Sequence, residues 1–111
     1  MPRVLLIDSD QQHAERVREQ LGFHAVEVEV IPDPRQAVAQ LKRDSADYAV
    51  VILNVSSAAL PWADTLAKLQ ESCLQPGAYP PPLFLCTSDT KRPPEFELRI
   101  ERMGARYVYE G

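Results

Sequence analysis

The sequence predicts an α/β fold in which helices cover both faces of a parallel β-sheet. Short apolar runs that suit buried strands alternate along the chain with segments whose apolar residues recur at helical spacing. Such alternation implies parallel strands joined by right-handed crossovers. With 111 residues, of which 45% are hydrophobic and 25% charged, the chain suits a single globular domain that buries a full core.

The first third of the chain predicts two strands around one helix. Residues 4–7 form a continuous apolar run, which is typical of a central strand buried on both faces. Ser9 begins a capping-box-like sequence, and the following apolar residues at helical spacing predict a helix of about three turns that Gly22 closes. Residues 26–30 alternate between valine and glutamate, as in an edge strand with one wet face.

The middle of the chain predicts a helix, a strand and a second helix. Asp33 offers an N-cap acceptor and Pro34 suits the first helical position, so this helix is expected to run to about Arg43. Residues 49–53 are apolar throughout and predict a third, buried strand. Within 62–73, apolar side chains recur at helical spacing and predict a helix with one continuous apolar face.

The last third of the chain predicts a stiff connector, a strand, a short helix and a final strand. The proline-rich stretch 75–82 is the connector, because proline lacks a backbone donor and restricts its neighbours. Residues 83–86 are predicted as the fourth strand. The helix is expected to be opened by Pro93 and closed by Gly104, and 107–109 form the fifth strand.

Composition excludes several classes of function. A net charge of -4 and the lack of a basic run exclude the phosphate-neutralising surface of a direct nucleic-acid binder. No apolar stretch approaches the roughly 18 residues of a transmembrane helix, and no signal peptide precedes the first strand. We therefore expect a cytoplasmic protein without membrane contact. Cys73 and Cys86 lack the number and spacing of a disulfide framework or metal site, and we expect buried free thiols.

No catalytic motif stands out in the sequence. It contains no Gly-rich phosphate loop, nucleophile elbow or histidine cluster, so we do not expect an enzyme. His13 and His24 stand alone, and surface or packing roles are expected for both.

Polar residues follow four of the five predicted strands, and the carboxyl ends of parallel strands meet at one edge of a sheet. These residues are Asp8, Ser9, Asp10, Asn54, Thr87 and Glu110. Together with the apolar strands and the closing segment 104–109, they resemble the receiver domain of bacterial two-component response regulators. The resemblance implies a flavodoxin-like, CheY-like three-layer sandwich whose five-stranded parallel sheet has the order 2-1-3-4-5, with four helices and the fifth helix missing or truncated.

The resemblance also implies what each strand end would do, and the reactive residues are largely absent. Asp8 matches the first acid of a receiver, Ser9 falls where the second, metal-contacting carboxylate belongs, and Asp10 lies one residue too far along. Asn54 fills the position of the phosphate-accepting aspartate, and an amide is not a phosphoryl acceptor. We therefore expect no cofactor, and only weak binding of Mg²⁺, which prefers oxygen ligands.

Three further positions complete the comparison with a receiver. Thr87 matches the switch hydroxyl, and Tyr107 matches the aromatic switch position or packs as an ordinary strand aromatic. Glu110 falls at the lysine position and replaces the needed cation by a like charge. Asn54 is expected either to hydrogen-bond with Asp8, Ser9 or Thr87 or to serve as a simple polar loop start.

These departures predict a degenerate pseudo-receiver without phosphorylation chemistry. Residues 1–111 are expected to be a receiver-like domain from the N-terminal part of a longer regulator, acting by protein–protein interaction. A receiver also carries a fifth helix after its last strand, so one sheet face is expected to be covered by an output domain, a protein partner or a second copy in a homodimer. The alternative is an atypical receiver that is still phosphorylated or metal-bound through Asp8 or Asp10.

Overall fold

The computed structural model describes residues 2–23, 25–44, 47–54, 62–73, 81–86 and 96–107. Across these residues the chain forms a five-stranded sheet with the order β2-β1-β3-β4-β5, in which every neighbouring pair is parallel. The elements are β1 (Arg3–Ile7), α1 (Gln11–Gly22), β2 (Glu27–Ile31), α2 (Pro34–Asp44), β3 (Val50–Asn54), α3 (Trp62–Ser72), β4 (Leu83–Cys86), α4 (Phe96–Arg102) and β5 (Arg106–Tyr107). This order confirms the predicted α/β architecture.

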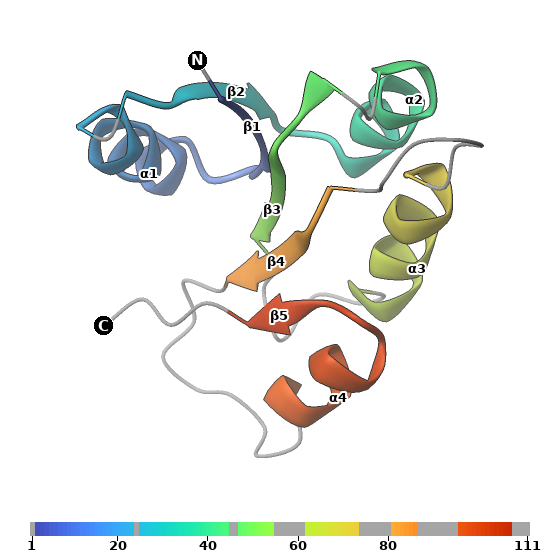
Figure 1. The fold of residues 1–111 in the computed structure, drawn as a ribbon. Coiled ribbons are helices and arrows are strands. Elements are labelled where there is room, and N and C mark those ends of the chain that lie inside the picture. Colours follow the sequence, from blue (N-terminus) through green and yellow to red (C-terminus); the bar gives the residue numbers. More distant parts are fainter. Residues whose placement is uncertain are drawn as a thin grey trace.

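The helices form two layers around the sheet (Figure 1). On one face, α1 packs against side chains of β1 and β2, whereas α2, α3 and α4 cover the other face. β1 is an interior strand between β2 and β3, with Val4 beside both Val28 and Val50. Its residues Leu5, Leu6 and Ile7 are all buried, which confirms the prediction of a strand covered on both faces.

The start of α1 differs from the prediction. The N-cap is Asp10 rather than Ser9, because the Asp10 carboxylate accepts hydrogen bonds from the backbone N–H groups of Gln12 and His13. A carboxylate at this position satisfies donors that the first helical turn leaves unpaired, and it complements the helix dipole. The helix therefore begins at Gln11, one residue later than predicted.

The other boundaries lie within a residue or two of the predictions wherever the structure describes them. Asp33 precedes α2 and accepts a 2.9 Å hydrogen bond from the backbone N–H of Arg35, as expected of a residue that caps a helix. β3 extends to Asn54, so this residue belongs to the strand itself. β5 is assigned to Arg106–Tyr107, and the rest of the predicted strand 107–109 lies outside the described residues, as do Pro93, His24 and most of the connector.

α4 ends in a left-handed turn, as the glycine in the sequence indicated. Gly104 has a φ of 87°, and its N–H donates to the carbonyl of Glu101 while the N–H of Ala105 donates to the carbonyl of Ile100. This pair of bonds is the Schellman arrangement that commonly closes helices. Ile100 and Ala105 are both buried, so the turn also returns the chain to the core beside β4.

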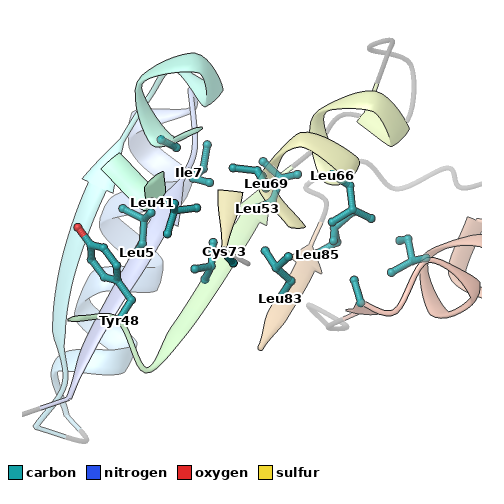
Figure 2. Close-up of a cluster of buried hydrophobic side chains, with 14 residues drawn as sticks. Leu5, Ile7, Leu41, Tyr48, Leu53, Leu66, Leu69, Cys73, Leu83 and Leu85 are labelled. Atoms are coloured by element: carbon teal, nitrogen blue, oxygen red, sulfur yellow. The ribbon is translucent and has the colours of Figure 1, made fainter. Parts of the chain in front are cut away.

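The larger core lies between the sheet and α2, α3 and α4 (Figure 2). Leucines dominate it, with Leu5, Leu53 and Leu85 from the sheet meeting Leu66 and Leu69 from α3. The cysteines Cys73 and Cys86 are both buried free thiols, which confirms the sequence prediction, and burial raises the pKa of Cys73. No helix among the described residues is long and apolar enough to cross a bilayer.

The opposite sheet face is covered less completely. Side chains of β1 and β2 on this face, such as Leu6 and Val28, are buried beneath α1. Further along the sheet, Val50 and Ile52 of β3 and Phe84 of β4 are only partly buried, although they alternate with fully buried neighbours that face the larger core. The apolar layer on the α1 side is therefore thinner over β3 and β4 than over β1.

A polar cluster joins β1, β2 and α2 beside the core. Arg3 donates a 3.2 Å hydrogen bond to Glu29, and its guanidinium lies 5.1 Å from the centre of the Tyr48 ring. The Tyr48 hydroxyl donates to Glu29 and accepts a 3.2 Å hydrogen bond from Gln40. These contacts satisfy the phenol of a residue whose ring belongs to the core, as buried tyrosines require.

We predict that this cluster makes stability decrease at alkaline pH. Burial raises the pKa of Tyr48, and the hydrogen bond to Glu29 raises it further. An unfolded tyrosine ionises at about pH 10. The folded protein keeps the proton to higher pH, so the stabilisation is complete below about pH 10 and is lost as the pH rises through the folded pKa. Urea unfolding across this range should show a smaller alkaline loss for Tyr48→Phe, and equal losses would contradict the prediction.

Candidate functional site

The candidate site lies at the carboxyl end of β1, which Asp8 follows. The backbone N–H of Asp8 donates a 3.1 Å hydrogen bond to the carbonyl of Ile31, which extends the pairing of β1 with β2 by one residue. The Asp8 side chain points into the protein, since only 2% of the residue is exposed. A carboxylate buried this deeply must be satisfied by donors from its surroundings.

Three donors converge on the Asp8 carboxylate. Its Oδ1 atom accepts a 2.8 Å hydrogen bond from the Nδ2 atom of Asn54 and a 2.9 Å bond from the backbone N–H of Asp10. Its Oδ2 atom contacts the Nδ1 atom of His13, which lies in the first turn of α1. Asp8 therefore ties together the ends of β1 and β3 and the start of α1.

Asn54 extends this cluster toward β4. The Sγ atom of Cys86 lies 3.8 Å from Oδ1 of Asn54, so the thiol acts as a weak donor to the amide oxygen. Asn54 and Cys86 are direct neighbours in the sheet register. The NH₂ group of the Asn54 amide donates to Asp8, and its oxygen accepts from Cys86. This arrangement confirms the predicted hydrogen bond to Asp8 and goes beyond a simple polar loop start.

The other two residues of the predicted acidic pocket are not buried in this cluster. Ser9 is exposed. Asp10 is also exposed, and its Oδ1 atom is occupied as the N-cap of α1. The structure thus brings Asp8 and Asn54 together and keeps the Ser9 and Asp10 side chains outside the buried cluster.

The remaining predicted positions cannot be placed in the site. Thr87 and Glu110 lie outside the described residues. The backbone of Tyr107 pairs with Leu85 in β5, whereas the Tyr107 side chain lies outside what the structure describes.

His13 is the site residue that sequence reasoning missed, because it was expected to be isolated. The structure corrects this expectation: His13 is only 1% exposed and its imidazole meets Asp8. A usable signal was present, since His13 precedes Val17 by four residues and Leu21 by eight, which places all three on the inner stripe of the helix. Because His13 lies in the first turn of α1, its imidazole meets Asp8 at the end of β1.

The described residues at this edge, Asp8, Asn54 and His13, do not form a donor set that fits Mg²⁺, the ion that the receiver resemblance implies. Mg²⁺ takes near-octahedral oxygen coordination, normally with one or two carboxylates. Both oxygens of Asp8 already accept hydrogen bonds from protein donors, and Asn54 turns its NH₂ group rather than its oxygen toward them. Within the described ranges, no group of three or more histidine, cysteine or acidic side chains is placed to hold a metal ion.

Comparison with solved structures places the chain among receiver-type α/β folds. It is similar to a response regulator receiver domain protein from Clostridium thermocellum, with a TM-score of 0.74 and 16% identity over 97% of this chain and 81% of that one. It is also similar to the chemotaxis protein CheY4 of Vibrio cholerae, with a TM-score of 0.67 and 20% identity over 99% of this chain and 87% of that one.

A third similar structure is a de novo designed Rossmann 2x3 protein, with a TM-score of 0.68 and 15% identity over 99% of this chain and 80% of that one. No protein-family model and no curated protein matches the sequence. At these identities the likeness establishes the CheY-like, flavodoxin-like fold. Function must be argued from the site, because one fold supports many functions.

Proposed function

We propose that this chain is a phosphorylation-independent pseudo-receiver, a signalling module of a two-component-type regulator that acts through protein contacts rather than catalysis. The observation that carries the proposal is Asn54 at the end of β3, with its amide hydrogen-bonded to Asp8 at 2.8 Å. An amide offers no carboxylate oxygen for an acyl phosphate. The receiver-type fold of the solved structures gives the proposal its context.

The hydrogen bonds at the strand ends support a site held in one geometry. Phosphoryl transfer depends on positioned cations that neutralise developing charge. Here the carboxylate of Asp8 is occupied by three protein donors and Asp10 caps α1. The alternative, phosphorylation or metal binding through Asp8 or Asp10, would have to displace these bonds.

We propose two separate docking surfaces, which lie on opposite faces of the sheet. One is the thinly covered sheet face around Val50, Ile52 and Phe84. The other is α4 with β5, where Leu98 is 47% exposed and the neighbouring charges are mixed. Exposed or half-buried apolar side chains on each surface favour a protein neighbour. We propose that the neighbour is an output domain or partner protein, with a homodimer as the further option, and not a nucleic acid.

A phosphodonor experiment tests the proposal. After incubation with acetyl phosphate and Mg²⁺, the intact mass of the native chain should be unchanged, because the acceptor carboxylate is missing. A receiver with a complete site, incubated in the same tube, serves as the positive control. Appearance of a phosphate adduct on the native chain would contradict the proposal and support the alternative through Asp8, Ser9 or Asp10.

Partner capture tests the second half of the proposal. Native chain and Asn54→Asp should retain the same proteins with and without phosphodonor, because binding does not use the acceptor position. A partner that binds only phosphodonor-treated Asn54→Asp would contradict phosphorylation independence. Circular dichroism spectra of the two chains should first be matched, since the substitution places a second carboxylate beside Asp8.

A further inference from the structure

The pair of Asp8 and His13 is unusual for its burial. The side chains of Asp8 and His13 are 0% and 2% exposed, so the carboxylate and the imidazole meet away from water. Burying an ionised carboxylate is costly unless opposite charge or donors compensate it. Among the ion pairs of the described residues, the partner of Asp8 is His13.

The two oxygens of the Asp8 carboxylate have different partners. Oδ1 receives the Asn54 amide and the Asp10 N–H, and Oδ2 receives the imidazole of His13. Because an ionised carboxylate only accepts hydrogen bonds, a hydrogen bond at Oδ2 calls for a proton on the Nδ1 atom of His13. The imidazole occupies the oxygen that the Asn54 amide leaves open.

The backbone that carries the imidazole is held in place by local hydrogen bonds. Asp10 caps α1 and accepts a 3.2 Å hydrogen bond from the backbone N–H of His13, which orients the first turn. The N–H of Asp10 in turn donates to Asp8. The short segment from Asp8 to His13 therefore closes on itself through backbone and side-chain bonds.

We propose that His13 is a positioning residue that takes the place of a divalent cation at this strand end. It holds the Asp8 carboxylate, and through Asp8 the amide of Asn54, in one arrangement without a metal ion. The arrangement of Asp8 and Asn54 is therefore the same with and without Mg²⁺. This inference goes beyond the proposed function, because it assigns the cation's role to a side chain, and its test does not depend on any partner.

Binding of a metal ion near Asp8 tests this role. If His13 only packed in the core, replacing it would not change whether the site binds a divalent cation. In the native ¹⁵N-labelled chain, Mn²⁺ used as a paramagnetic substitute for Mg²⁺ should leave the amide signals of Asp8, Ser9 and Asp10 unbroadened. His13→Met removes the donor while keeping an unbranched apolar side chain. In this variant the same signals should broaden, because a cation can reach Oδ2.

Stability measurements provide a matched pair of variants. His13→Met should raise the unfolding equilibrium constant by roughly 10- to 100-fold, since a buried acceptor loses its donor. Mg²⁺ should reverse part of this increase relative to NaCl of equal ionic strength. His13→Gln keeps an N–H donor and should remain insensitive to Mg²⁺. The proposal would be overturned if the native chain bound Mn²⁺ as readily as His13→Met. It would also be overturned if His13→Met folded but showed neither broadening by Mn²⁺ nor stabilisation by Mg²⁺.

The native chain supplies an independent test in case His13→Met does not fold. A two-bond ¹H–¹⁵N spectrum of the histidine rings reports which ring nitrogen carries a proton. Protonated Nδ1 in His13 is the expected result. A neutral ring protonated only at Nε2 would leave no donor for Asp8, and the proposal would fail.

Discussion

Asp8→Ala is expected to lower the free energy of unfolding by about 3–5 kcal/mol, because it leaves several buried groups without their acceptor, each at a cost of roughly 1–3 kcal/mol. The substitution deletes the acceptor shared by His13, Asn54 and the N–H of Asp10. The imidazole, which is almost fully buried, would then have lost its carboxylate partner. Urea unfolding followed by circular dichroism measures the change directly.

Asp10→Ala is the matched control, because Asp10 carries the same functional group two residues away on the surface. It should cost about 1 kcal/mol, as expected for loss of an N-cap. A cost for Asp8→Ala no larger than that for Asp10→Ala would show that the buried network contributes little. The combined Asp8→Ala and His13→Met variant should cost less than the sum of the two single variants, because they remove the same contact.

Leu5→Ala is expected to lower the free energy of unfolding by about 2–5 kcal/mol, the range for leucine truncations in packed cores. Leu5 is fully buried in β1, and it belongs to the cluster between the sheet and α2, α3 and α4 (Figure 2). The loss combines apolar surface returned to water with the cavity that surrounding leucines cannot fill. Thermal and urea unfolding should both record it.

Leu98→Ala on α4 makes the same chemical change at a site that is 47% exposed. Its effect should stay within about 0.5 kcal/mol, as is usual for surface positions. Similar costs for the two truncations would contradict the assignment of the core to the α2, α3 and α4 face of the sheet. Partner capture by Leu98→Ala would in addition test whether α4 belongs to a docking surface.

Much of the fold could be predicted because its signals are local. The apolar run of β1 and the Asp33–Pro34 start of α2 each depend on neighbours a few residues apart, and the structure confirms both. The helix start at Ser9 was wrong for a local reason as well. Serine and aspartate both cap helices, and only the backbone geometry selects Asp10.

The candidate site was predictable in its positions and less so in its contacts. Because the carboxyl ends of parallel strands meet at one edge of a sheet, Asp8 and Asn54 were predicted to lie near each other. The structure places them in direct contact. This rule does not apply to His13, because His13 lies on a helix and does not follow a strand. Its role depends on how α1 sits over the end of β1, which is a property of the packed protein.

The sequence by itself determined the order of strands and helices along the chain, the apolar faces and the amide of Asn54 at the end of the third strand, because these follow from residue type and short-range spacing. Only the tertiary structure decided that Asp8 is buried and that Asn54 and His13 share it. The Asp8–Asn54 bond joins residues 46 positions apart, and the Asp8–His13 pair depends on the seating of α1. Desolvation and hydrogen-bond geometry decide such contacts, and both exist only once the layers have packed.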